Sequence, residues 1–305
     1  MQIDYAAITH PGRVRKNNED AYLLSALNGD EPILNTPPRP LPVTDAGFLA
    51  AVADGMGGAA AGEVASREGL AAVALHLFGH WGRFTEQPRR EEDLLEALVI
   101  AVEEASSAIL RYSDDDRTAR GMGSTLTAAL FWNQQAYVAQ VGDSRAYLFR
   151  QGKLHQLTED QTLVNDLVAS GTLTLEQAKV HPQRNMITQA LGSPQQLVVV
   201  VYRIHLRRGD RLLLCSDGLH GEVDDARLRD ILAPGFSPRK TLENLVEEAI
   251  ANGGRDNITA MLLALNDPLL PLPAAQEVPV VEKPLLPVVP KGWMRKIKTM
   301  FGARP

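Results

Sequence analysis

The sequence contains a single cysteine, Cys215, so no disulfide bond can form within the chain. It has no uninterrupted apolar stretch of about twenty residues, which a membrane-spanning helix requires, and no cationic segment followed by an apolar one at its start. These absences predict a protein of the reducing cytoplasm, without a signal peptide or a membrane span. Cys215 ends an apolar run and is expected to be a buried strand thiol rather than a nucleophile.

Basic charge is also in short supply. Lys and Arg number 31 against 37 Asp and Glu, which gives a formal net charge of −6 and a sequence pI near 5.7. Proteins that bind nucleic acid usually carry a basic surface, so this balance argues against nucleic acid as a partner. The apolar content of 45% is ordinary for a globular protein and supplies the core of one large domain.

Short apolar runs separated by turn residues predict strands. The run Gly47–Ala53 is apolar throughout, so we expect a strand buried on both faces that delivers Asp54 at its end. Residues 124–150 are predicted to form an antiparallel meander, and the polar loop 13–20 to join two strands as a hairpin. Helices are predicted over residues 62–78, 91–112, 226–232 and 239–252, the last one with Ser237 as its cap. Runs of strands interspersed with pairs of helices favour an α+β sandwich with antiparallel sheets over a doubly wound parallel sheet.

Composition changes after Asn266. We predict one folded domain over residues 1–266 and an extended, proline-rich linker over residues 267–290, because its seven prolines exclude helix and central strand. Residues 291–305 form a short basic segment that closes the chain.

Acidic residues follow predicted strand ends or turns in four separated motifs. Mg²⁺ and Mn²⁺ prefer several carboxylate oxygens that converge from different parts of a fold. Each motif alone could be an ordinary turn, but together they predict a metal site, and the glycines after Asp54 would let a main-chain carbonyl join it. The four motifs are Asn18-Glu19-Asp20, Ala53–Gly58, Ser216-Asp217-Gly218 and Arg255-Asp256-Asn257.

A pair of such ions, about 4 Å apart, can activate water for attack on phosphorus without a protein nucleophile. The phosphate must also be held, and a guanidinium gives permanently charged, bidentate recognition of phosphate oxygens. Arg15, four residues before Glu19, is the candidate for this role, and the alternative is that it is an ordinary surface arginine.

Six motifs occur in the order and approximate spacing of the metal-dependent protein serine/threonine phosphatases, the protein phosphatase 2C-like or PPM family. The sequence resembles the compact bacterial members of this family over residues 3–265. The motifs are Ala53–Gly58, Gly123-Ser124-Thr125, Val141–Arg145, Ala190-Leu191-Gly192, Ser216-Asp217-Gly218 and Arg255-Asp256-Asn257.

The resemblance implies a sandwich of two antiparallel β-sheets flanked by antiparallel helix pairs, in α-β-β-α layers, with a binuclear Mn²⁺ or Mg²⁺ centre at one end. By similarity, Asp54 bridges both ions, and Asp217 and Asp256 complete one of them. The other ion would take the Gly55 carbonyl with Glu19 or Asp20. The remaining assignments by similarity are Asp143 for a third, weaker ion, Arg15 for the phosphate, and residues 158–187 for the flap that borders the substrate cleft.

One position departs from the family pattern. Some members carry a histidine directly after the Asp-Gly pair as the acid for the leaving group, and here that residue is Met56. The proton donor is therefore unassigned, with metal-bound water as the simplest substitute and His181 and His220 as weaker candidates.

The resemblance predicts a phosphatase that hydrolyses phosphoserine and phosphothreonine in proteins and opposes a bacterial serine/threonine kinase. Two alternatives stay open. The chain could be an inactive relative that binds phosphoproteins, although its intact Asp54, Asp217 and Asp256 argue against this. It could also act on a small phosphoester or on an anti-sigma-factor antagonist.

The C-terminal segment lies outside the resemblance. As a helix, residues 293–301 would gather their apolar side chains on one face, with basic residues on most of the remainder. Such a segment suits an anionic membrane surface or a groove on a partner protein, which would place the enzyme at the inner face of the membrane. The alternative is a tail that is disordered or folds back onto its own domain. The apolar residues are Trp293, Met294, Ile297, Met300 and Phe301.

Overall fold

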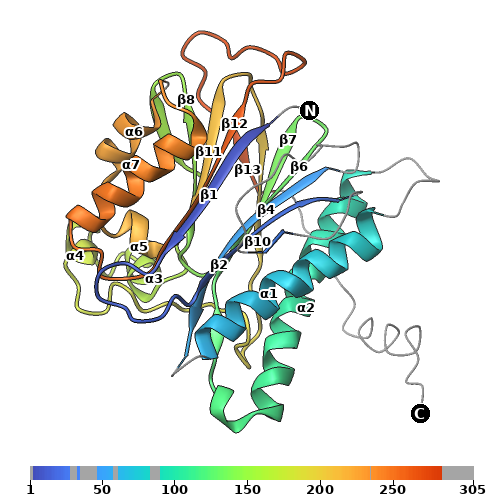
Figure 1. Cartoon of the computed structure of the whole chain (residues 1–305), viewed down its shortest axis with the longest axis vertical. Helices are drawn as coiled ribbons and strands as arrows, with labels where there is room; N and C mark the ends of the chain where they lie inside the picture. The colour runs from blue at the N-terminus through green and yellow to red at the C-terminus, as the bar shows by residue number, and fades with distance from the viewer. Residues whose placement is uncertain are drawn as a thin grey trace.

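The computed structural model describes residues 3–27, 33–34, 47–57, 61–82, 90–233 and 235–283. Two antiparallel sheets lie face to face, and helices cover the outer face of each sheet (Figure 1). The predicted α+β sandwich with α-β-β-α layers is confirmed.

The first sheet has the strand order β1-β12-β11-β8-β9. Its strands are β1 (Asp4–His10), β12 (Ile258–Leu265), β11 (Asp210–Cys215), β8 (Arg145–Arg150) and β9 (Lys153–Gln156). The second sheet has the order β13-β10-β7-β6-β4-β2-β3, with β5 paired to β4 beside this path. Its strands are β13 (Val281–Glu282), β10 (Val200–His205), β7 (Gln135–Val141), β6 (Leu126–Trp132), β4 (Phe48–Met56), β2 (Asp20–Ala26), β3 (Ile33–Leu34) and β5 (Gly123–Ser124).

The helices divide between the two outer faces and one end of the sandwich. The second sheet is covered by α1 (Ala61–Leu77), a π-helical turn (Phe78–Gly82) and α2 (Glu91–Asp115), which ends near a 3₁₀ turn (Arg117–Ala119). The first sheet is covered by α6 (Asp225–Leu232) and α7 (Pro238–Ala251). The short helices α3 (Leu163–Ala169), α4 (Leu175–Lys179) and α5 (Asp217–His220) lie together at one end (Figure 1).

Strand β4 shows why the chain forms a sandwich. Successive side chains of a strand point to opposite faces, so a continuous apolar run must be covered on both sides. One set of β4 side chains packs between the sheets and the other packs against α1 and α2, which confirms the predicted doubly buried strand. The residues between the sheets are Phe48, Ala50 and Val52, and those under the helices are Leu49, Ala51 and Ala53.

The helix predictions agree closely with the structure. Ser237 caps α7 as expected, with its hydroxyl accepting from the Lys240 amide. Within the described ranges, no helix has both the length and the apolar character needed to cross a membrane.

Two predicted strand connections are wrong. Strand β1 does not form a hairpin with β2, because β1 pairs with β12 and β2 pairs with β4 in the other sheet. The predicted meander is also interrupted. Strands β6 and β7 form a hairpin in the second sheet, but β8 lies in the first sheet and pairs with β11 there. Local turn residues indicate where a strand ends, whereas distant apolar faces decide which strand it joins. Both misassigned connections, residues 11–19 and 142–144, cross from one sheet to the other.

Residues 267–283, which we call the C-terminal strap, pack onto the domain. Strand β13 pairs with β10 at the edge of the second sheet, and Leu270 is buried in the core between the sheets. Glu277 accepts from the buried Arg150 at 2.9 Å and from Arg207. The contacts of the domain therefore continue past residue 266 to Lys283, and the remaining linker and the basic segment, residues 284–305, lie outside the described residues.

We expect removal of the strap to destabilise the domain. A chain that ends at Asn266 leaves Arg150, which is 2% exposed, without Glu277 and uncovers the site of Leu270. The lost charged hydrogen bond and apolar burial should lower the free energy of unfolding by about 3 kcal/mol in urea. A chain that ends at Lys283 is the control and should unfold with the full-length protein. Equal urea midpoints for the two truncations would show that the strap adds nothing.

Candidate active site

The pairing of β2 with β4 brings the first two acidic residues together. In this antiparallel register, Asp20 lies directly opposite Asp54, so both side chains lie at the same end of the second sheet. The Asp54 amide donates to the Thr125 hydroxyl at 2.9 Å, and the Thr125 amide donates back to the Asp54 carbonyl at 2.9 Å. The backbone of Asp54 is therefore fixed on both sides.

The third acidic residue comes from the other sheet. Asp217 begins α5 directly after β11, and its neighbour Ser216 donates from its hydroxyl to Asp20 Oδ2 at 2.7 Å. The same hydroxyl accepts from the Thr259 amide at 3.0 Å, which ties it to β12. Ser216 thus joins the two sheets at the acidic end, a role that its motif did not reveal.

The crossing segment 11–19 supplies the arginine. Arg15 Nη2 donates to Asp256 Oδ2 at 2.7 Å, although the two side chains are 241 positions apart. Asn257 holds the crossing in place, because its side chain accepts from the Glu19 amide and donates to the carbonyls of Pro11 and Asn17. Sequence analysis gave Asn257 no function of its own.

Gly55 packs against the start of α1 with no room for a side chain. A Cβ at this position would overlap the carbonyl oxygens of Gly62 and Glu19. The Gly55 amide donates to the Glu19 carbonyl at 3.2 Å, and Ser66 of α1 donates to the same carbonyl at 2.6 Å. The glycine therefore lets β4, α1 and the Glu19 segment approach one another closely.

The acidic side chains raise one another's pKa values. Burial, with the charges of Asp217 and Asp256, raises the pKa of Asp20 to about 8 despite the hydrogen bond from Ser216. Burial and the neighbouring aspartates also raise the pKa of Asp54 well above its ordinary range. The pKa of Asp217 is raised by burial and by Asp256. The negative charges of this cluster are therefore not fully balanced by positive charge.

The donor set fits divalent cations. Two buried carboxylate oxygens, Asp20 Oδ1 and Asp217 Oδ1, have no hydrogen-bond partner among the described residues. Buried charged oxygens are costly unless they are paired or coordinate a metal. Hard cations such as Mg²⁺ and Mn²⁺ take carboxylate and carbonyl oxygens as ligands, and all the candidates here are of those types.

The acidic side chains of the site are not oriented as a set of metal ligands in this structure. Among the described residues, no group of three or more acidic, histidine or cysteine side chains has a geometry that would hold a metal ion. Asp217 instead lies close enough to Asp54 for its charge to raise the pKa of Asp54, and Asp256 faces Arg15. Binding of cations would therefore require these carboxylates to turn from one another, on a backbone that is already in place.

Asp143 lies on the second crossing segment and is 7% exposed. Burial and the charges of Asp217 and Asp160 raise its pKa to about 7. The preceding residue, Gly142, has a φ of +93°, and a Cβ there would press against the Thr125 side chain. The turn that presents Asp143 therefore requires glycine.

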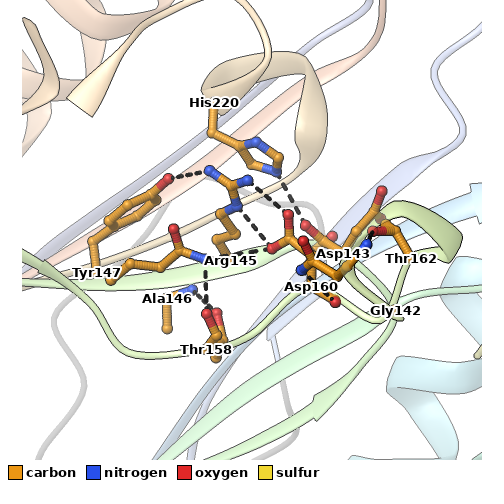
Figure 2. A network of polar contacts seen from close by, with 12 residues as sticks. Gly142, Asp143, Arg145, Ala146, Tyr147, Thr158, Asp160, Thr162 and His220 are labelled. Atoms are coloured by element: carbon orange, nitrogen blue, oxygen red, sulfur yellow. Dashed lines mark hydrogen bonds and ion pairs between the residues drawn. The ribbon is translucent and has the colours of Figure 1, made fainter. Parts of the chain in front are cut away.

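A polar network connects Asp143 to the base of the flap, residues 158–187 (Figure 2). Arg145 donates two hydrogen bonds to Asp160, at 2.8 and 2.6 Å, and a third to the Tyr147 hydroxyl at 2.8 Å. The backbone of Gly142 exchanges hydrogen bonds with Gln161, one with its side chain and one with its amide. The loop of Asp143 and the start of the flap therefore form one rigid unit.

A cleft of about 780 Å³ opens between the flap and α5. It reaches three of the predicted site residues, Asp143, Asp217 and Asp256, and its far wall is formed by Arg184 and other flap residues. The predicted site residues thus lie at one end of the sandwich, with a cleft large enough for a peptide side chain.

His220 also lines this cleft, but it is not an acid. Its Nε2 donates to the Asp143 carbonyl at 3.0 Å (Figure 2). Burial, with the charge of Arg145, lowers the pKa of His220 to about 3, so the ring is neutral and its proton is held by the carbonyl. His181 lies within the flap, where Nδ1 accepts from the Gln183 amide, and Met56 has no proton to give.

Carboxylates gathered from four segments of the chain, beside a guanidinium and a cleft, form a donor set that would suit divalent cations and a phosphate ester. The family model of protein phosphatase 2C matches residues 41–252. The serine/threonine protein phosphatase PstP of Mycobacterium tuberculosis is 38% identical over 268 residues, which make up 88% of this chain and 46% of that protein. The chain thus spans less than half the length of this relative. The serine/threonine phosphatase stp of Listeria welshimeri is 34% identical over 85% of this chain and 94% of that protein.

Solved structures agree with the sequence comparisons. The crystal structure of the M. tuberculosis serine/threonine phosphatase PstP/Ppp superposes with a TM-score of 0.71 at 36% identity, over 88% of this chain and 100% of that one. The catalytic domain of PstP in complex with 2 manganese ions gives a TM-score of 0.68 at 35% identity, over 87% of this chain and 99% of that one.

The chain therefore belongs to the protein phosphatase 2C family. The family predicted from the six sequence motifs is confirmed.

We expect Mn²⁺ to stabilise the fold, because cations would offset the repulsion among the buried carboxylates. At a hundred times its dissociation constant, the ion should add about 2.7 kcal/mol to the free energy of unfolding. Asp54→Asn should reduce this gain, and Asp230→Asn, an exposed carboxylate of α6, should keep it. Thermal unfolding with Mn²⁺ and with EDTA measures the difference. A gain that is the same in Asp54→Asn and wild type would place the ions elsewhere.

Proposed function

We propose that this chain is a serine/threonine protein phosphatase that uses two Mn²⁺ or Mg²⁺ ions to hydrolyse phosphoserine and phosphothreonine in proteins. Membership of the protein phosphatase 2C family supports the chemistry. The observation that carries the proposal is the contact between Arg15 and Asp256, since it puts a phosphate-binding cation at the edge of the acidic cluster.

The ligands follow from the donor set. Asp54, Asp217 and Asp256 would hold the ions with the Gly55 carbonyl, and Glu19 or Asp20 would complete the set. Burial raises the pKa of the Glu19 carboxyl group. A cation bound nearby would lower this pKa again and favour the ionised carboxylate, which suits Glu19 to this position. When bound, the ions would supply the positive charge that lowers the pKa of a water molecule for attack on phosphorus.

A third, weaker ion would use Asp143. Its carboxyl group lies within the electrostatic reach of Asp217 and lines the same cleft. The hydrogen bonds between Gly142 and Gln161 join the backbone next to Asp143 to the base of the flap, so the flap and this ligand would respond to each other.

Arg15 would orient the phosphate. Its Nη2 donates to Asp256, but a guanidinium has five N–H donors, and the side chain is 56% exposed toward solvent. Donors therefore remain for two phosphate oxygens, and the charge of Asp256 keeps the guanidinium pointed at the cluster. Neither Met56 nor the neutral His220 can protonate the departing oxygen, so the chain contributes no imidazole acid from these positions.

Turnover in the presence of a chelator tests the proposal. Hydrolysis of p-nitrophenyl phosphate and of a phosphothreonine peptide should stop in EDTA and return with Mn²⁺. Asp54→Asn should lower kcat/KM on the order of a thousand-fold, which corresponds to about 4 kcal/mol, while Asp230→Asn should behave as wild type.

The alternatives give different results in the same assay. Undiminished turnover in excess chelator would exclude a metal-dependent mechanism. Hydrolysis of small phosphoesters alone would point to a small-molecule substrate, and tight binding of the phosphopeptide without turnover would favour an inactive binding module.

We further propose that phosphorylated proteins are the substrates and that a serine/threonine kinase is the functional counterpart. The sequence of residues 291–305, which lie outside the described part, favours anchoring at the anionic inner face of the membrane. Their basic residues would attract anionic lipid, and the predicted apolar face of residues 293–301 would enter the interface.

The anchoring proposal predicts that the full-length chain sediments with vesicles containing phosphatidylglycerol. A chain that ends at Lys283 should stay in solution with unchanged turnover of p-nitrophenyl phosphate, because the strap and domain are intact. Vesicles of phosphatidylcholine alone are the lipid control. If both chains partition equally, the segment is not an anchor, and a protein partner captured only by the full-length chain would indicate a groove instead.

A further inference from the structure

The cleft is bordered by two cations of the flap, and neither has an ion-pair partner in the described part of the chain. Lys179 ends α4 and Arg184 lies in the turn that follows, and both side chains line the cleft. Unpaired cations beside an acidic metal centre require an explanation, because they do not stabilise the fold through any contact seen here.

Most of the other charges in the cleft are already matched. Arg145 is paired with Asp160 at 2.6 Å, and Arg255 is paired with Glu222 at 3.4 Å. The aspartates of the candidate metal centre would be matched by the bound ions. Asp225, at the start of α6, is the remaining carboxylate of the lining, and it lies within the electrostatic reach of Tyr147 on β8. Lys179 and Arg184 are thus the unmatched cations on the flap side of the cleft.

The backbone positions of Lys179 and Arg184 are well defined. The ends of the flap are joined by backbone hydrogen bonds, Leu163 to Met186 and Thr188 to Gln161, both at 2.8 Å. A capping box at Thr174 sets the start of α4, and the Arg184 amide donates to the His181 carbonyl at 3.1 Å. The backbone that carries the two cations is therefore set before any substrate arrives.

Helix α4 adds an apolar contact to the same wall. Leu175 is 63% exposed and lies four residues before Lys179, so the two side chains share one face of the helix. Both line the cleft. An exposed leucine next to a lysine and an arginine suits a peptide that carries both acidic and apolar side chains.

We propose that Lys179 and Arg184 bind acidic residues that flank the phosphorylated residue of the substrate. The proposal rests on the proposed phosphatase function and names its substrate class: phosphoserine or phosphothreonine within an acidic segment. The metal centre and Arg15 hold the phosphate itself, whereas the flap selects the chain around it. Because the two cations are exposed, their effect falls with ionic strength.

The test compares phosphothreonine peptides that differ only in flanking charge. One has aspartates before the phosphothreonine, one has them after it, one has glutamines and one has lysines. Wild type should hydrolyse one or both acidic peptides with a KM on the order of five-fold below that of the glutamine peptide at low salt. The preference should fade at 0.5 M NaCl.

Three variants assign the preference to the flap. In Lys179→Gln/Arg184→Gln the ratio of kcat/KM between acidic and glutamine peptides should fall to about one, and in Lys179→Glu/Arg184→Glu the lysine peptide should become the better substrate. The matched control is Lys153→Gln, an exposed lysine at the far end of β8 and β9, which should keep the wild-type ratio. Each ratio is taken within one variant, so a general loss of activity cancels.

The outcomes separate this inference from the proposed function. Wild type that hydrolyses all four peptides equally, or double variants that keep the acidic preference, would overturn the inference and leave the phosphatase intact. Wild type that hydrolyses no phosphopeptide with Mn²⁺ would overturn both.

Discussion

Repulsion among carboxylates at the place where two sheets meet is the constraint on which the rest of the structure depends. Asp20 and Asp54 end strands of one sheet, and Asp217 and Asp256 flank strands of the other. The hydroxyl of Ser216 and the guanidinium of Arg15 offset part of this repulsion. Neither of these supplies the charge of a divalent ion, so this end of the sandwich is the place where cation binding and folding would be linked.

The two ends of the sandwich differ: one end carries stabilising contacts, and the other carries the candidate site residues. The far end of the sandwich is closed by ordinary stabilising contacts, in which the C-terminal strap buries its own Leu270 between the sheets and completes the partners of Arg150. The opposite end holds the chain segments that cross between the sheets, and these carry Arg15, Glu19 and Asp143. Because a crossing segment belongs to neither ladder, its side chains can face the acidic end of the sandwich while its ends are fixed by strands.

The sequence predicted the elements that local pattern controls. The apolar run of β4 and the three- and four-residue spacing of α2 both indicated the observed structure. It also indicated the acidic motifs, because ligand chemistry restricts residue type. It did not predict that β1 and β2, or β7 and β8, lie in different sheets, since each of these strands pairs with a partner that is not its neighbour in the sequence, such as β12 for β1 and β11 for β8. Ser216 and Asn257 were missed for the same reason: their partners, Asp20 and the 11–19 crossing, are distant in sequence.

The two segments that cross between the sheets have different contacts. The first, with Arg15, is tied to the start of β12 through Asn257, and among the described residues it makes no hydrogen bond to the flap. The second, with Asp143, shares hydrogen bonds with Gln161 at the flap base, and Arg145 anchors Asp160 directly below it. A displacement of the flap by a bound peptide would therefore be transmitted to Asp143 through these hydrogen bonds, but it would leave Arg15 in place. In the proposed function, phosphate binding and recognition of the surrounding chain would thus be carried by separate parts of the fold, so that substitutions in the flap would change specificity without disturbing Arg15.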